Sequence, residues 1–220
     1  KLIRAKNIVS NAGIMTTYNT LLPSTTVAKH RLKEQLQKVK PSVAHVSLYI
    51  GLEGSPEDLQ LPKTNYWIYP VEGDHDTCVK RYLDDLSQPF PMVYLSFPSA
   101  KDPDWSNRYP GKSSIDIITL MPFETFQKWS DTSWKKRGDD YETMKEDIAK
   151  RLLKELYKQL PQVEGKIHCY ELSTPVTTQH FVNYKNGEVY GLDHSPSRFR
   201  QSFLTPRTPI KNFYLTGQDI

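Results

Sequence analysis

The sequence predicts an α+β (or α/β) fold, in which a mixed β-sheet is covered by helices. Short β-branched and aromatic runs alternate irregularly with longer amphipathic stretches, and Pro or Gly bounds most of these segments. No repeat of fixed period and no low-complexity segment interrupts this pattern. The 220 residues are enough to bury the core of one large domain or of two small ones.

The first half of the chain predicts one helix and several strands. Residues 2–9 are mainly apolar and lead into the small-residue turn 10–13, which indicates a strand with a tight exit. Residues 26–39 carry apolar side chains at helical spacing until Pro41 stops the pattern, so an amphipathic helix is expected. Three further strands are predicted from β-prone runs at residues 43–52, 66–69 and 92–97.

The second half begins with a predicted loop at residues 98–114, where Pro and Gly stand among Asp, Ser and Asn. An apolar run follows at 115–121. The longest helical stripe covers 141–160 and ends at Pro161. The remaining predicted elements are a strand at 167–172, a short helix at 176–182 and a strand at 213–216.

Composition and charge exclude several function classes. The net charge of +4 comes from 29 basic and 25 acidic residues without a dense basic run, so nucleic-acid binding is not predicted. Mean hydropathy is −0.61, and no apolar run approaches the roughly 18 residues of a membrane-spanning helix. The first residues alternate charged and apolar side chains, which is not typical of a signal peptide. The chain begins as if cut from something longer, and its compartment is left open.

Several common site motifs are absent from the sequence. No two glycines are separated by a single residue, so a GxGxxG dinucleotide motif is excluded. Gly111-Lys112-Ser113 resembles the end of a phosphate-binding loop, but Ser106 stands where the first glycine is required. The six histidines lack HExxH spacing and do not pair with cysteines, so no metal site is predicted. No GxSxG elbow supports a serine hydrolase.

The two cysteines, Cys78 and Cys169, are expected to be ordinary thiols, although the sequence leaves a bridge between them open. His168 precedes Cys169 in a predicted strand. Adjacent strand residues point to opposite faces, which favours simple neighbours over a base and its nucleophile. The aromatic share of 11% allows either a cavity lining for an elongated apolar ligand or ordinary core packing, and packing is the expected use of most rings.

Two segments at opposite ends of the chain carry a family resemblance. Residues 3–13, followed by Thr17-Tyr18 and 21–23, resemble the strand–turn segment of FAD-dependent oxidoreductases related to phytoene desaturase, carotenoid isomerase and all-trans-retinol saturase. Residues 190–194 and 209–220 resemble the closing flavin-contact segment of the same family. The retinol-saturase branch is the nearest match to these segments. The intervening segments 51–52, 67–69, 96–99 and 102–103 are similar to that branch too.

The resemblance implies a division of the chain into domains. Residues 1–21 and 175–220 would be partial FAD-binding segments, and residues 22–174 would be the substrate-binding domain. Seven residues would lie against the flavin by this analogy, namely Asn11, Ala12, Gly13, Tyr190, Gly191, Gly217 and Asp219. The family's N-terminal glycine-rich motif and final helix are missing here, so the site for FAD would be incomplete and the fragment alone inactive.

The function implied is hydride transfer between FAD and a conjugated polyene, giving saturation, desaturation or isomerisation. No acid–base pair is required, catalytic residues stay unassigned, and His194 is expected to be a hydrogen-bonded turn residue. The expected partners are an apolar polyene and, transiently, a membrane surface, although no anchor is visible. The alternatives are a noncatalytic module for a lipid-like ligand or protein partner, and an apolar surface that forms a homodimer.

Overall fold

The computed structural model describes residues 2–70 and 73–220, and the chain divides into two compact units. The terminal unit joins both ends of the chain, Lys1–Val43 and Gln179–Ile220. The central unit is Ala44–Thr178. No helix in the described part of the chain is long and apolar enough to cross a membrane.

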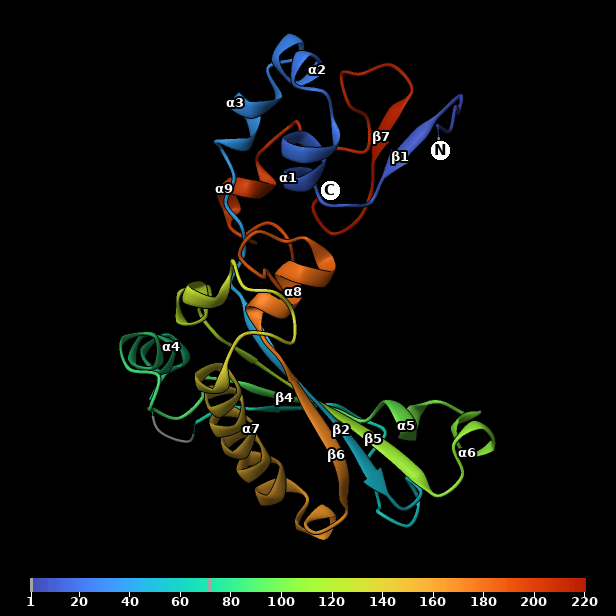
Figure 1. Ribbon diagram of the computed structural model, residues 1–220, viewed down its shortest axis with the longest axis vertical. Coiled ribbons are helices and arrows are strands. Elements are labelled where there is room, and N and C mark those ends of the chain that lie inside the picture. Colours follow the sequence, from blue (N-terminus) through green and yellow to red (C-terminus); the bar gives the residue numbers. More distant parts are fainter. Residues whose placement is uncertain (1, 71–72) are drawn as a thin grey trace. The chain divides into compact units, whose positions relative to one another are not determined.

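The central unit is built on a five-stranded sheet in the order β3-β4-β5-β2-β6, and all neighbouring strands in it run antiparallel (Figure 1). The long central strands β2 and β5 pair over nine residues each, from His45↔Leu120 to Glu53↔Lys112. The strands are β2 (His45–Glu53), β3 (Tyr66–Ile68), β4 (Val93–Ser96), β5 (Lys112–Leu120) and β6 (Ile167–Ser173).

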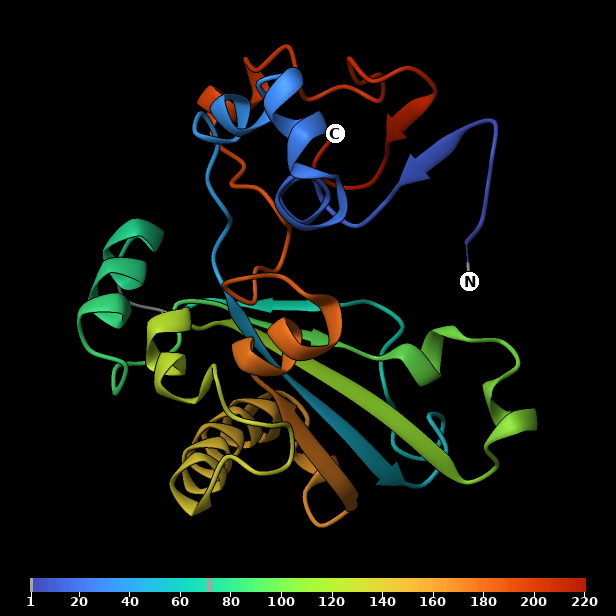
Figure 2. The ribbon, with the colours of Figure 1, turned by 45° about the horizontal axis from the view of Figure 1, so that its top comes forward.

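One face of this sheet packs against the long helix α7 (Asp139–Gln159), which lies along it in Figure 2. Alternate strand residues such as Leu48, Ile117 and Leu172 are at most 2% exposed and form one core with Leu152 of α7. Because successive strand residues point to opposite faces, the residues that alternate with these buried ones belong to the second face of the sheet. The other helices of this unit are α4 (His75–Asp84), α5 (Pro98–Lys101), α6 (Trp105–Arg108), the 3₁₀ turns η2 (Phe123–Thr125), η3 (Gln127–Trp129) and η4 (Pro161–Val163), and the start of α8 (Pro175–Val182).

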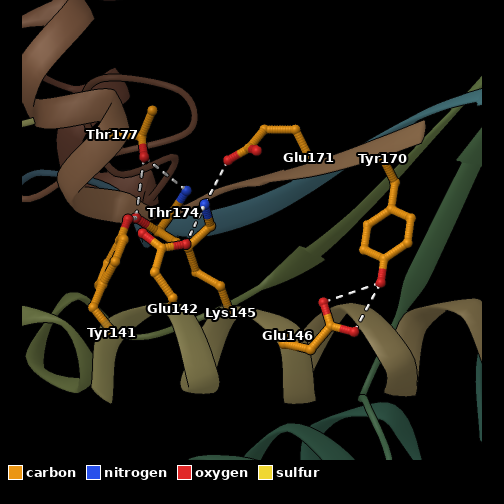
Figure 3. A network of polar contacts seen from close by, with 8 residues as sticks. All are labelled: Tyr141, Glu142, Lys145, Glu146, Tyr170, Glu171, Thr174 and Thr177. Carbon is orange, nitrogen blue, oxygen red and sulfur yellow. Dashed lines mark hydrogen bonds and ion pairs between the residues drawn. The ribbon is translucent and has the colours of Figure 1, made fainter. Parts of the chain in front are cut away.

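Polar contacts join α7 to β6 and α8 (Figure 3). The buried hydroxyl of Tyr141 shares a hydrogen bond of 2.8 Å with Thr174 Oγ1. Lys145 Nζ lies 2.5 Å from Glu171 Oε1 on β6, and Glu142 provides a second carboxylate. These contacts hold the first turns of α7 against the edge strand of the sheet.

The terminal unit contains a short parallel pair, β1 (Ile8–Ser10) and β7 (Phe213–Leu215). Its helices are α1 (Ile14–Thr16), the π-helical turn η1 (Thr17–Leu21), α2 (Ser24–Lys29), α3 (Leu32–Leu36) and α9 (Pro196–Phe199). A second apolar cluster forms the core of this unit and includes Ile14, Tyr18, Leu32, Leu192 and Leu215.

The prediction of an α+β fold is confirmed, but the prediction of a mixed sheet is wrong. The five-stranded sheet is antiparallel throughout, and the one parallel pair among the described residues, β1 with β7, forms a separate sheet. Strand direction depends on which distant segments pair, and local patterns do not report it. The expected opening strand at 2–9 shortens to Ile8–Ser10.

Two further local predictions are also wrong. The predicted helix 26–39 is broken, because Arg31 adopts a left-handed conformation with φ of 52° between α2 and α3. The predicted loop 98–114 contains α5 and α6, and β5 already begins at Lys112. Pro98 occupies the first turn of α5, where its fixed φ favours a helix start over the loop that its presence suggested. Cys78 and Cys169 form no disulfide, which settles the open question of a bridge.

Candidate functional site

The parallel pairing of β1 and β7 brings two distant turns to one edge of the small sheet. Ser10 pairs with Leu215, and the backbone N–H of Thr216 donates to the carbonyl of Ser10 at 2.9 Å. The turns that follow the two strands therefore start side by side. Gly217 has φ of 104°, and a Cβ there would lie only 2.2 Å from Oδ1 of Asn11. Only glycine allows this close approach.

Asp219 connects the two turns to a third segment. Its side chain is 3% exposed, and its two carboxylate oxygens accept separate backbone hydrogen bonds. Oδ2 accepts from the N–H of Ile14 at 2.8 Å, and Oδ1 accepts from the N–H of Leu192 at 2.9 Å. We call the segments 11–14, 190–192 and 216–219 the turn cluster. The carboxylate of Asp219 is its common centre.

Two glycines make room for this carboxylate. A Cβ on Gly191 would lie 2.2 Å from Oδ1 of Asp219, and one on Gly13 would lie 3.2 Å from Oδ2. Both residues have positive φ, 66° and 77°. The small residues of the turn cluster are therefore required by contacts within the chain, whether or not a ligand is bound.

Arg198 supports the cluster from α9. The residue is 5% exposed, and its guanidinium donates to the carbonyl of Leu192 at 3.1 Å and to the carbonyl of Gln218. The side chain of Gln218 in turn donates to the hydroxyl of Tyr184 at 2.8 Å. These bonds fix the backbone of the last turn.

The last turn also presents unused donors. Within residues 2–70 and 73–220, the backbone N–H groups of Gly217, Gln218 and Asp219 have no hydrogen-bond partner. Gly217 and Gln218 are exposed. Successive free N–H groups in a turn form a concave site for an anion or for an oxygen-rich ligand. The backbone of the turn cluster, and not the saturated carboxylate of Asp219, is thus the part that can bind a phosphate or a polyol.

A cavity of about 670 Å³ adjoins the small sheet within the terminal unit. Its volume lies in the range of ordinary small-molecule sites. Apolar and polar side chains share its wall, and the hydroxyls of Ser10 and Thr17, 2.7 Å apart, belong to it. The other lining residues are Ala5, Lys6, Ile8, Val9, Leu21, Leu22, Thr26, Ile210, Lys211, Asn212 and Phe213.

A second acid lies near the turn cluster, and sequence reasoning missed it. Glu188 is 5% exposed, and its Oε2 accepts from the N–H of Asn186 at 3.1 Å. Burial raises the pKa of Glu188, and the charge of Asp219 raises it further. Burial also raises the pKa of Tyr184. A lone Glu after Asn-Gly reads as an ordinary turn residue, so no sequence signal identified it.

The seven residues predicted to contact a flavin are distributed unevenly. Asn11, Gly13, Gly191, Gly217 and Asp219 meet in the turn cluster, and Ala12 lies in its first turn. Tyr190 is 54% exposed and its ring instead packs at 5.7 Å against His194. Flavin binding by these residues stays a prediction. Within the part of the chain that the structure describes, no group of three His, Cys, Asp or Glu could hold a metal ion.

Comparison with known proteins confirms the resemblance. The all-trans-retinol 13,14-reductase of Macaca fascicularis is 38% identical over 220 residues, which cover 97% of this chain and 36% of that protein. The prolycopene isomerase of Arabidopsis thaliana is 28% identical over 85% of this chain and 28% of its own length. The phytoene desaturase of Fusarium fujikuroi is 26% identical over 96% of this chain and 37% of its own length.

Three further findings accompany this similarity. The chain spans about a third of the length of the retinol reductases that it matches. A protein of Danio rerio named an inactive all-trans-retinol 13,14-reductase is also 32% identical over 99% of the chain. No protein-family model matches the chain.

Proposed function

From the homology of this chain to all-trans-retinol 13,14-reductases, a prolycopene isomerase and phytoene desaturases, we propose that it is part of an FAD-dependent oxidoreductase that acts on a conjugated polyene. The substrate class is a retinoid or carotenoid. Residues 1–21 and 175–220 would belong to the flavin-binding part, and residues 22–174 would form the substrate-binding domain. Residues 22–43 pack within the terminal unit, together with most of the flavin-binding part.

The observation that carries this proposal is the turn cluster. Residues from the two ends of the chain, more than 200 positions apart, are joined through the carboxylate of Asp219. The free N–H groups of Gly217 and Gln218 suit the oxygens of the ribityl chain or the pyrophosphate of FAD. The space that the glycines leave is filled by Asp219 and Asn11, so a ligand would meet the exposed N–H groups of the last turn. The residues present therefore fit a flavin.

The bound flavin would supply the hydride chemistry. The work of this chain is then binding, orientation and the exclusion of water, which needs no acid–base pair. Asp219 is a positioning residue, because both of its oxygens are used inside the chain. No catalytic residue is assigned, so the proposal includes three reactions, namely saturation, desaturation and isomerisation.

The test uses the full-length protein that contains this chain, loaded with FAD and incubated with all-trans-retinol under anaerobic conditions with and without a reductant. Saturation adds two hydrogens to the product mass, desaturation removes two, and isomerisation leaves the mass unchanged while the retention time changes. Residues 1–220 purified alone are expected to show neither a flavin spectrum nor turnover. Turnover without flavin, or no turnover of any retinoid or carotenoid, would overturn the proposal.

A second candidate is a noncatalytic protein that binds a lipid-like ligand. The inactive relative in Danio rerio favours it, because that protein is similar over the same segment. Binding of retinol by the flavin-loaded full-length protein without any change in product mass or retention time would support this second function.

A further inference from the structure

The second face of the five-stranded sheet, turned away from α7, carries a polar group among apolar ones. The strand register places Tyr49 on β2, Asp116 on β5 and Ser96 on β4 in one row across the sheet. The next row consists of Ile118 on β5, Tyr94 on β4 and Trp67 on β3. Side chains two apart on a strand share a face, so the two rows are neighbours.

Asp116 is the residue of this face whose partial burial no contact within the chain explains. Its residue is partly buried in the middle of the sheet, and burial raises the pKa of its carboxyl group. Within residues 2–70 and 73–220, the carboxylate has neither a hydrogen-bond partner nor an ion-pair partner. Partial burial of an unpaired carboxylate costs free energy, because lost hydration is not replaced. Such a group is a candidate for ligand recognition.

The charges around Asp116 restrict the ligand. The charge of Lys101 on α5 acts on this carboxyl group and opposes the rise in its pKa. The ammonium of Lys101 itself donates to Ser96 Oγ at 3.0 Å and to the side-chain oxygen of Asn65. A cationic ligand would be repelled by Lys101, and an anionic one by Asp116. A neutral hydrogen-bond donor, such as a hydroxyl group, is repelled by neither charge and can donate to the carboxylate of Asp116.

The neighbouring row fits an apolar body. The rings of Trp67 and Tyr94 lie 4.8 Å apart between centroids, and Trp67 is 54% exposed. With Ile118 they form an apolar row about 10 Å long, since neighbouring strands are about 4.8 Å apart. Aromatic faces of this kind pack well against a conjugated chain. Tyr49, which is 50% exposed, extends the row of Asp116 on the other side.

We propose that the second face of the sheet binds an apolar alcohol of the retinol class, with its hydroxyl donating to the carboxylate of Asp116 and its polyene along Ile118, Tyr94 and Trp67. This inference rests on the proposed function and deepens it. It makes Asp116 the residue that selects an alcohol over a hydrocarbon of the same shape.

The experiment compares two probes, all-trans-retinol and its methyl ether, which keeps the polyene but lacks the hydroxyl donor. Affinities for the full chain are measured by quenching of tryptophan fluorescence. A hydrogen bond to a charged acceptor predicts that the protein binds retinol about 10-fold to 100-fold more tightly than the ether. In Asp116→Asn this preference should fall to a few-fold, while the affinity for the ether stays unchanged.

A matched control is Glu171→Gln, on β6 beside Tyr49. It removes the same charge from the same face, but Lys145 holds this carboxylate, so the preference for retinol should persist. If Asp116→Asn fails to fold, the unmodified protein serves instead, because its preference should fall when Asp116 is protonated at acid pH. The charged or titratable groups that face Asp116 are Lys101 on α5 and, in its own row, Tyr49 and Glu171, so the same pH series on Glu171→Gln is the control.

The outcomes separate this inference from the proposed function. Equal binding of both probes by the unmodified protein would show that water alone solvates Asp116, which overturns the inference and leaves the proposed function standing. Equal losses for both probes in Asp116→Asn would indicate a structural role and also overturn it. Binding of neither probe, by this chain or by the full-length protein, would count against both.

Discussion

Two aspartates, one in each unit, are used in opposite ways. Asp219 in the terminal unit is 3% exposed, and each of its oxygens accepts a backbone hydrogen bond. Asp116 in the central unit is partly buried and accepts none from the residues that the structure describes. An acid whose oxygens accept hydrogen bonds within the chain supports the framework of a site, whereas an acid without such partners is available to a ligand. The comparison predicts opposite effects for the same substitution at the two positions.

The largest expected effect comes from crowding the satisfied acid. In Gly191→Ala the new Cβ would lie 2.2 Å from Asp219 Oδ1, so the turn cluster must open. We expect a loss of more than about 3 kcal/mol of local stability, from the broken hydrogen bonds and the left-handed backbone together. Hydrogen exchange at the amides of Ile14 and Leu192 measures it directly.

The matched control is Gly111→Ala. Gly111 has φ of 67°, almost equal to the 66° of Gly191, but nothing lies within 4 Å of its Cβ position. Only the backbone cost of about 1–2 kcal/mol should remain. Equal losses at both glycines would show that Asp219 does not require the space at Gly191.

Asp219→Asn should have the next largest effect. The amide keeps one acceptor oxygen, so either Ile14 or Leu192 loses the partner of its buried N–H group. The expected cost is about 1–3 kcal/mol, with faster exchange at one of the two amides. Under the proposed function, the full-length protein should also retain flavin more weakly. Unchanged protection at both amides would contradict the central role of this carboxylate.

A smaller loss is expected in the central unit for Tyr141→Phe. The substitution removes the buried hydrogen bond to Thr174, whose hydroxyl keeps a second contact to Thr177 at 3.2 Å (Figure 3). The free energy of unfolding in urea should fall by about 1 kcal/mol. Tyr170→Phe is the control, because its partner Glu146 is solvated and the loss there should be smaller. A larger loss in the control would reverse this ranking.

The sequence predicted what depends on local pattern. The stripe that predicted a helix at 141–160 corresponds to α7, because twenty residues of regular spacing outweigh any single exception. The break at Arg31 and the direction of the strands were missed, since both depend on contacts with distant segments. Pro98 was read as a loop residue although it starts a helix.

The candidate site shows the same division. Family resemblance selected Gly13, Gly191, Gly217 and Asp219, and these residues do meet, although their contacts are with one another. Physical patterning alone would have missed Asp219, whose partners are 27 and 205 positions away. Asp116 was also missed, because a polar residue alternating with Ile115 and Ile117 reads as an ordinary solvent-facing strand position. Only the strand register shows which residues lie beside Asp116, and none of them pairs with its carboxylate.

The smallest expected effect is a gain in stability. Burial raises the pKa of Asp116 above the ordinary value of 3.8, so the folded state binds the proton more tightly than the unfolded state does. The stability that this group contributes is therefore complete below the unfolded pKa and is lost as the pH rises through the folded pKa. Asp116→Asn does not titrate, so it should unfold at a slightly higher urea concentration than the unmodified protein at pH about 7, with the difference vanishing near pH about 3.5.

Glu146→Gln gives the opposite sign and serves as the control. The hydrogen bond from Tyr170 lowers the pKa of Glu146, so its stabilising effect is present at neutral pH and is lost as the pH falls through the folded pKa. This variant should therefore be slightly less stable than the unmodified protein at neutral pH. If Asp116→Asn also proves less stable at neutral pH, a favourable contact holds that carboxylate in the folded protein. Asp116 would then resemble Asp219, and the argument that it is reserved for an alcohol would fail.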